Sequence, residues 1–214
     1  MQTPPAADLD PGEVSLLETA WEEVQPAPAR RLLIAAVEAF AAKGYHATTT
    51  RDIASRVGMS PAGVYVHYRA KEELLYRICL IGHRHSLVVI RAAAERGGDD
   101  PAEQLRAVIG DFAAWHARFH VPARVIAYEL GALDPGHLTE IVGLRREIDQ
   151  VVRATLERGV ARGVFDVPDV AGTAMALESL TVDVARWYRA SGSRTPEDVA
   201  KLYADLALRM VLFT

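Results

Sequence analysis

One stretch of this sequence constrains the fold more than any other: GYHATTTRDIASRVGMSPAGVYVHYRAKEELL, residues 44–75. Thr49 or Thr50 can cap a first short helix, because a hydroxyl oxygen accepts a hydrogen bond from a free N–H of the first turn. Gly58 stands where that helix must turn, and glycine adopts the positive φ of such turns without the steric cost of a Cβ. The stretch therefore predicts two short helices joined by a tight turn.

The second short helix begins directly after the turn. Ser60 is a natural N-cap, and Pro61 suits the first helical position, where its missing N–H leaves no hydrogen bond unmade. Val64 faces Ile53 of the first helix, and Ala54 is small enough to let the two helices cross. This is the helix-turn-helix arrangement, in which the second helix enters the major groove of DNA and the first lies across the backbone.

The segments on both sides of this motif strengthen the prediction. Residues 30–44 place Leu33, Val37 and Phe40 on one helical stripe. After the turn, VYVHYRAKEELL resembles the aromatic-His-aromatic and Lys-Glu signature of the tetracycline repressor (TetR) family, and ATTTRDIA is similar to the start of that family's second helix. The resemblance covers residues 29–78. It implies an all-α protein with an N-terminal three-helix, helix-turn-helix head and a larger helical body for ligand binding and dimerisation.

Two positions depart from the family's pattern. Ala70 stands where the family usually has Ser or Asn, so the helix that starts at Lys71 lacks a side-chain cap. Because of Ala62 and Gly63, the second short helix has few polar side chains that could contact bases. This second departure keeps an alternative open, namely a helical binding or interaction protein whose head does not read DNA specifically. Salt-dependent, sequence-selective DNA binding would separate the two interpretations.

The resemblance implies two sets of contacts with double-stranded operator DNA. The side chains that match the family's phosphate-contacting positions are Thr50, Arg51, Tyr65, His67 and Lys71. Base reading falls to residues that can meet thymine methyl groups or let the backbone approach closely, which are Ser60, Pro61, Ala62, Gly63 and Val66. Arg51 is the best polar candidate for a base contact.

The formal net charge of −4 does not exclude a DNA-binding head, because the charge is unevenly distributed. Residues 1–25 contain six acidic residues and no Lys or Arg, whereas residues 26–75 contain seven basic residues against four acidic ones. Within the acidic part, residues 13–24 have helical spacing of apolar side chains, including Trp21. We expect this extra helix to dock on the protein through Trp21, since phosphate repels its carboxylates.

Every segment beyond the head has helical periodicity, and none alternates like a strand. The expected helices cover residues 71–95, 101–119, 120–133, 137–162, 169–189 and 196–213. Except at the junction of residues 119 and 120, the breaks between them contain glycine or proline. The sequence thus predicts three parts: an acidic extension (1–25), a helix-turn-helix DNA-binding domain (26–75), and a helical regulatory and dimerisation domain (76–214).

The last two expected helices carry more apolar residues than a small core needs. These residues are Ala171, Ala174, Met175, Leu177, Val182, Val184, Val199, Leu202, Leu206, Leu208, Met210, Val211 and Leu212. In the resembled family these helices form the four-helix interface of a homodimer, and two heads read a pseudo-palindromic site. A homodimer is also expected because one short recognition helix rarely gives useful affinity alone.

A regulator needs a signal to respond to, and the helical body has room for a site that binds a small molecule. A ligand that binds the DNA-competent and DNA-incompetent states with different affinity would shift the balance between them. Most of the residues that are candidates to line the ligand site are apolar, which predicts an apolar effector. The candidates are Leu87, Phe112, Trp115, Phe119, Val125, Tyr128, Glu129, Met175, Glu178 and Trp187. The ending DVARWYRASGSRTPEDVAKLY is similar to the branch of the family that answers to acyl-coenzyme A thioesters, so an acyl-type effector is a second interpretation. No cofactor is expected.

Other classes of function find little support. The sequence has no G-x-S-x-G motif and no phosphate-binding glycine loop, so we expect no enzyme. His116 and His120 are four residues apart but fall at a helix junction without a third ligand, so we expect no metal site. Cys79 lies among apolar residues and is expected to be a core thiol. No apolar run is long enough for a membrane span, and we expect a cytoplasmic protein.

Overall fold

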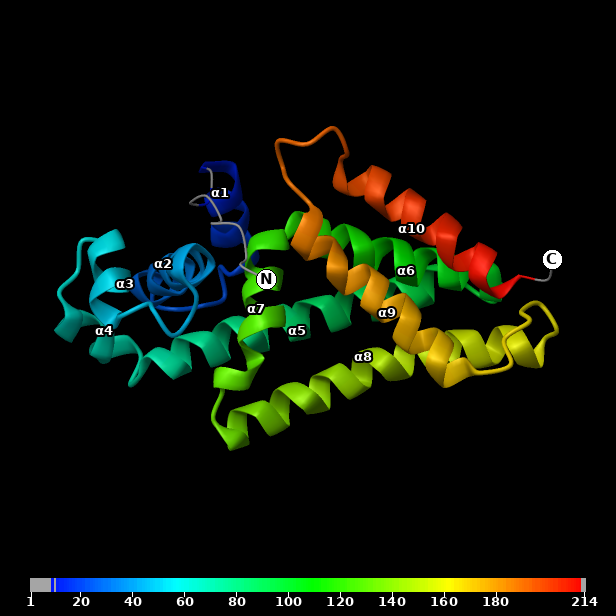
Figure 1. Ribbon diagram of the computed structural model, residues 1–214, viewed down its shortest axis with the longest axis horizontal. Helices are drawn as coiled ribbons and strands as arrows, with labels where there is room; N and C mark the ends of the chain where they lie inside the picture. Colours follow the sequence, from blue (N-terminus) through cyan, green and yellow to red (C-terminus); the bar gives the residue numbers. More distant parts are fainter. Residues whose placement is uncertain (1–8, 10, 213–214) are drawn as a thin grey trace. The chain divides into compact units, whose positions relative to one another are not determined.

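The computed structural model describes residues 9 and 11–212. Over these residues the chain forms ten α-helices, one 3-10 helix and no strand, so the predicted all-α class is confirmed (Figure 1). The chain divides into two compact units. Unit 1 contains the described residues up to Gly82 together with Val121–Ile141, and unit 2 contains His83–His120 and the described residues from Val142 onward.

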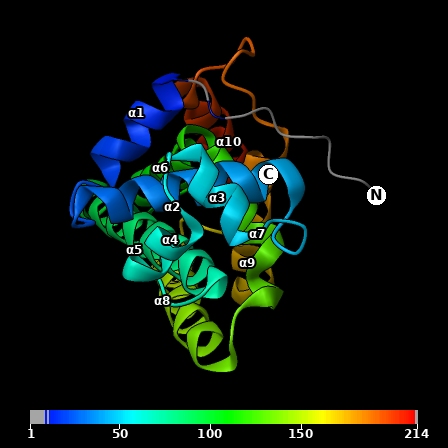
Figure 2. The same cartoon turned by 90° about the vertical axis from the view of Figure 1, so that its left-hand side faces the viewer.

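Unit 1 holds the helix-turn-helix. Its elements are α1 (Pro11–Ala20), α2 (Ala27–Lys43), α3 (Thr50–Arg56), α4 (Pro61–His67), the first part of α5 (Lys71–Arg96), most of α7 (His120–Glu129), the 3-10 helix η1 (Leu130–Ala132) and the start of α8 (Pro135–Ala161). Figure 2 looks onto α2, α3 and α4, and in this group α2 packs against α3 and α3 packs against α4. The predicted inner residues Leu33, Ile53 and Val64 are completely buried.

The N-terminal helix α1 packs on α2. Leu17 and Trp21 are 2% and 3% exposed, as expected for a helix that docks on the protein. The Arg30 guanidinium also donates a hydrogen bond of 3.0 Å to the carbonyl oxygen of Glu22. Residues 1–8 and 10 of the predicted acidic extension lie outside the described part of the chain.

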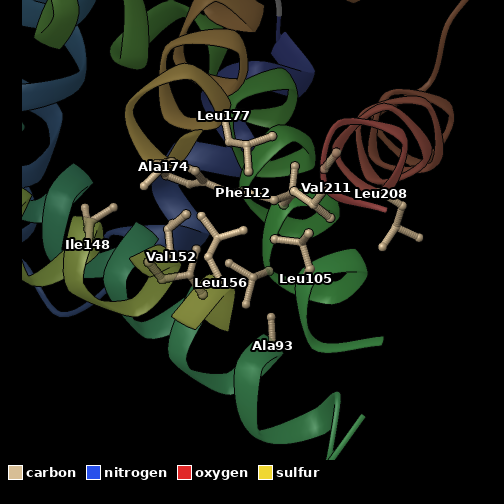
Figure 3. Close-up of a cluster of buried hydrophobic side chains, with 14 of the residues drawn as sticks. Ala93, Leu105, Phe112, Ile148, Val152, Leu156, Ala174, Leu177, Leu208 and Val211 are labelled. Atoms are coloured by element: carbon tan, nitrogen blue, oxygen red, sulfur yellow. The ribbon is translucent and has the colours of Figure 1, made fainter. Parts of the chain in front are cut away.

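Unit 2 is built from the rest of α5 and α8 with α6 (Pro101–Arg118), α9 (Val170–Trp187) and α10 (Pro196–Val211). Helix α6 packs against both α9 and α10. Figure 3 shows the apolar side chains that fill the space between these helices, among them Phe112, Val152 and Leu177. At Gly110 a Cβ atom would lie 3.3 Å from the carbonyl oxygen of Ala200, so glycine lets α6 and α10 approach closely.

Most predicted helix boundaries agree with the structure within a few residues. The exception is the segment 120–133, where α7 ends at Glu129 and the tighter turn of η1 follows. The predicted end of the last helix at residue 213 lies outside the described residues. The two units do not coincide with the three predicted parts, because Val121–Ile141 groups with unit 1, and that division stays a prediction.

Two further sequence expectations concern burial. Cys79 is fully buried, and burial raises the pKa of its thiol to about 12, which suits a core residue and not a reactive one. Among the described helices, none combines the length and the apolar character that a membrane span requires.

Candidate nucleic-acid interface

The start of α3 is fixed by a reciprocal cap. The Thr49 hydroxyl accepts a hydrogen bond of 3.1 Å from the N–H of Asp52, and the Asp52 carboxylate accepts one of 2.8 Å from the N–H of Thr49. Lys43 also pairs with this carboxylate, at 3.0 Å. Hydrogen bonds from Thr49, and then the Lys43 ammonium, hold the pKa of Asp52 well below its usual range. Thr49, and not Thr50, is therefore the N-cap.

The turn and the start of α4 follow the predicted pattern. Gly58 has φ +68°, and the N–H of Met59 donates to the carbonyl oxygen of Ala54 at 2.9 Å. The Ser60 hydroxyl accepts a hydrogen bond of 3.2 Å from the N–H of Gly63, so Ser60 is the N-cap of a helix that starts at Pro61. These contacts fix the direction of α4 relative to α3.

The outward side of α4 is mainly apolar. Val64 points inward and is completely buried, whereas Tyr65 and Val66 are 53% and 79% exposed. The Tyr65 hydroxyl lies 3.4 Å from the Thr50 hydroxyl, which joins the two helices at their surface. At Gly63 a Cβ atom would come within 3.2 Å of the terminal methyl of Met59, so packing inside unit 1 also accounts for this glycine.

The basic residues of the motif differ in their surroundings. Arg51 is exposed at the start of α3, and Arg56 lies 3.3 Å from the Glu38 carboxylate. The Lys71 ammonium donates hydrogen bonds of 2.7 Å to the carbonyl oxygens of Tyr45 and Thr48, and it lies 4.1 Å from the centre of the Tyr45 ring. Desolvation by these neighbours lowers the pKa of Lys71. Lys71 therefore has a role in holding the loop before α3, which the sequence did not indicate.

The sequence did not predict a second group of contacts in unit 1. The Glu72 carboxylate accepts a hydrogen bond from the N–H of Asp134 at 3.0 Å and lies 2.9 Å from Nδ1 of His137. The side chains of Glu72, Asp134 and His137 are of the types that bind metal ions and lie close together. The contacts of Glu72 with His137 and with the Asp134 backbone, and the stacking of the Tyr76 and His137 rings with centres 3.7 Å apart, hold Glu72 and His137 in place within unit 1.

The ten candidate effector residues fall into both units. Val125, Tyr128 and Glu129 belong to unit 1, and the other seven belong to unit 2. Glu129 accepts a hydrogen bond of 3.0 Å from the N–H of Tyr45. Tyr128 and Met175 are 54% and 65% exposed, which suits a surface contact better than a closed cavity.

Four of the candidates in unit 2 are buried, and three of them are aromatic. Phe112, Trp115 and Phe119 lie on or directly after α6, and Leu87 lies on α5. The Trp115 ring N–H donates to Nδ1 of His85 at 3.3 Å, and Trp115 and Phe119 have ring centres 5.5 Å apart. Trp115, Phe119 and His85 form an aromatic cluster within unit 2, and Phe112 joins it through the His116 ring.

Of the remaining candidates on α9, Glu178 is half-buried and Trp187 is exposed. Burial, and after it the charge of Asp149, raises the pKa of Glu178 to about 7. Its Oε1 atom is buried and makes no hydrogen bond in the described part of the chain. A separate groove of about 590 Å³ has a charged and small-residue lining that includes none of the ten candidates: Arg96, Gly97, Glu103, Arg106, Ala107, Gly110, Asp111, Ala200, Lys201 and Ala204.

Two short helices that pack against each other across a glycine turn, with an exposed side on the second, form the helix-turn-helix arrangement that DNA-binding proteins use. The family model of bacterial regulatory proteins of the tetR family matches residues 32–78, and the model of the tetracyclin repressor-like C-terminal domain matches residues 98–211. The chain belongs to the TetR family, and it is a ligand-responsive DNA-binding transcriptional regulator. The resemblance seen in the sequence is thereby confirmed.

Individual relatives agree with this assignment. The HTH-type transcriptional repressor KstR2 of Rhodococcus jostii (strain RHA1) is 30% identical over 180 residues, which cover 83% of this chain and 87% of that protein. A tetR-family regulatory protein from Rhodococcus RHA1 has a TM-score of 0.81 and 40% identity, over 89% of this chain and all of that one. The structure of AibR in complex with isovaleryl coenzyme A and operator DNA shares the fold, with a TM-score of 0.75 and 21% identity over 86% of this chain and 97% of AibR.

Proposed function

We propose that this protein is a homodimeric repressor that binds a pseudo-palindromic operator through α4 and leaves it when a small apolar or acyl-type molecule binds. The observation that carries the proposal is α4, which packs on α3 through Val64 and exposes Tyr65 and Val66. The similar KstR2 is a repressor, which supports repression. Because operator DNA is the proposed partner, we place the protein in the cytoplasm, and we expect no catalytic activity from a member of a family of regulators.

The proposed phosphate contacts are Thr50, Arg51, Tyr65, His67 and Lys71. Arg51 is the strongest of them, because it is exposed and no carboxylate in the described part of the chain pairs with it. The Lys71 ammonium already donates two hydrogen bonds inside unit 1. To contact a phosphate it must break one of them or share it with the phosphate. We therefore propose that its larger effect on DNA binding is indirect, through the loop that leads into α3.

The proposed dimer interface lies on α9 and α10. Part of the apolar set predicted for it belongs to the core of unit 2, including Leu177, Leu208 and Val211. The remainder includes large side chains that stay exposed in the single chain, which are Met175, Leu206, Met210 and Leu212. Exposed apolar side chains gathered on two neighbouring helices favour a protein–protein contact, and the TetR family dimerises through these helices.

The proposed effector site is centred on the aromatic cluster of unit 2. Aromatic walls bind apolar ligands, and a small number of polar groups orient them. Glu178 is the best such group, because its Oε1 atom is buried without a hydrogen bond and can accept one from a ligand. A change in Trp115 fluorescence on addition of an apolar or acyl-type compound, lost in Trp115→Phe, would support this site.

Operator binding by single variants tests the proposal. Arg51→Ala and Tyr65→Ala should each weaken binding to the selected operator by about tenfold, because charged phosphate contacts and surface hydrogen bonds on DNA contribute on the order of 1–2 kcal/mol each. Arg146→Ala, which removes an exposed arginine of unit 2, is the matched control. Binding is measured by fluorescence anisotropy at two salt concentrations, with the dimer checked by light scattering.

The outcomes separate the proposal from its alternative. Unchanged affinity in both Arg51→Ala and Tyr65→Ala would contradict the proposed interface. Binding that depends on salt but is equal for operator and unrelated duplex would favour the alternative, a helical interaction protein whose head does not read DNA specifically.

A further inference from the structure

The recognition helix α4 offers almost no polar group to a base edge. The Ser60 hydroxyl already caps the helix at Gly63, and the Tyr65 hydroxyl lies against Thr50. His67 is half-buried at the last position of the helix. The sequence of α4, PAGVYVH, contains no Arg, Lys, Asn or Gln, the side chains that read guanine or adenine by paired hydrogen bonds.

The same helix exposes an apolar surface. Val66 is 79% exposed, and no other large apolar side chain in the described part of the chain is exposed to the same degree. Ala62 is also exposed and lies one turn earlier, so the two side chains share one face of α4. When DNA covers a valine that is this exposed, apolar surface is removed from water, and this favours binding.

From these observations we infer that Val66, with Ala62 beside it, reads the C5 methyl group of a pyrimidine in the major groove, which in ordinary DNA is thymine. The inference rests on the proposed function, because it assumes that α4 enters the groove. The C5 methyl is the apolar group that base edges present there. Each half-site should therefore contain a thymine whose methyl group contributes to affinity.

Removal of single methyl groups tests this inference. An operator is first selected from random duplexes with the wild-type protein, and each thymine is then replaced by deoxyuridine, which lacks only the methyl group. We expect at least one position per half-site at which the replacement weakens binding about fourfold, and roughly sixteenfold when both half-sites are changed. A duplex with C·G at that position should bind more tightly when the cytosine carries a C5 methyl group.

The protein side of the experiment uses two valine variants. Val66→Ala should show a smaller difference between the thymine and deoxyuridine operators than the wild-type protein, because most of the apolar surface that contacts the methyl group is removed. Val88→Ala removes the same atoms from a valine of α5 that is 65% exposed, and it should keep the full difference. Thermal unfolding verifies that both variants are folded, as expected for such exposed positions.

The results distinguish this inference from the proposed function. If the wild-type protein enriches no sequence, the proposed function fails, and this inference with it. If a sequence is enriched but deoxyuridine is tolerated at every position, or if Val66→Ala keeps the wild-type difference, only the methyl reading is wrong.

Discussion

At the scale of single residues, Lys71 illustrates how a DNA-binding motif holds its own loop in place. Its ammonium group donates to two carbonyl oxygens that precede α3, those of Tyr45 and Thr48. Hydrogen bonds from charged groups contribute more than neutral ones, so Lys71→Ala should lower the free energy of unfolding by about 2 kcal/mol. It should weaken operator binding at the same time. Urea unfolding and anisotropy measure the two effects.

The control for this variant is Lys201→Ala, which removes an exposed lysine of unit 2. It should change neither stability nor operator affinity. A Lys71→Ala protein with wild-type stability but weaker DNA binding would show instead that Lys71 acts mainly on phosphate.

A second residue, His116, should make stability depend on pH. It is 6% exposed, and burial lowers the pKa of its imidazole to about 4 from an ordinary value of 6.5. Between these values the unfolded chain binds a proton that the folded protein does not, so stability present above pH 6.5 is lost as the pH falls toward 4. The loss is at most about 3 kcal/mol. His116→Leu should abolish this contribution to the pH dependence, whereas His46→Leu, at an exposed position, should keep it.

The stability of His116→Leu must be compared with that of the wild-type protein at each pH, because Glu178 makes stability depend on pH in the opposite direction. Its pKa is raised to about 7 from an ordinary value of 4.5. In that window the folded protein holds a proton that the unfolded chain releases, so this residue makes stability fall as the pH rises. The two slopes partly cancel in the wild-type protein. The free energy of unfolding of the wild-type protein minus that of His116→Leu should therefore rise with pH between about 4 and 6.5, and a difference that does not change with pH would contradict the assignment.

At the scale of helices, the chain uses the same N-terminal device twice. Thr49 and Asp52 cap α3 in unit 1, and Thr195 and Asp198 cap α10 in unit 2. Thr49→Ala and Thr195→Ala should each cost about 1 kcal/mol of stability, because each leaves a first-turn N–H without its acceptor. Only Thr49→Ala should also weaken operator binding, since α3 positions α4. Equal operator affinities in the two variants would argue against this role of α3.

The caps and turns show which parts of this fold are local in sequence. Ser60, Pro61 and Gly58 act within four residues of one another, so their spacing predicted the turn correctly. Lys71 and Tyr45 are 26 residues apart, and Glu72 and His137 are 65 residues apart. No periodicity or cap signal connects such pairs. Helix α4 was therefore predictable, while the contacts that hold the loop before α3 and the start of α8 were not.

At the scale of the whole molecule, the candidate effector residues show a related limit. Apolar composition marked Phe112, Trp115 and Met175 alike. The structure separates them, because the first two are buried in unit 2 and Met175 is 65% exposed. An amphipathic helix that packs on a core with one side and on a partner with another looks apolar all round. Helix α9 buries Ala174 and Leu177 and exposes Met175, so its apolar sequence could not separate core residues from exposed ones.

Assembly of two chains is the last property that can be tested at this scale. Leu206 and Met210 are one turn apart on α10 and are 39% and 44% exposed. Placing two carboxylates there, in Leu206→Glu/Met210→Glu, should give a folded monomer, because neither side chain is in the core of unit 2 but charge repulsion and desolvation oppose a symmetric contact. Operator affinity should fall by roughly a hundredfold or more, since the second head no longer binds as part of the same molecule. Light scattering and anisotropy measure the two effects, and Leu16→Glu, an equally exposed apolar position of α1, should leave both unchanged. A double variant that remains dimeric would place the interface elsewhere on the chain.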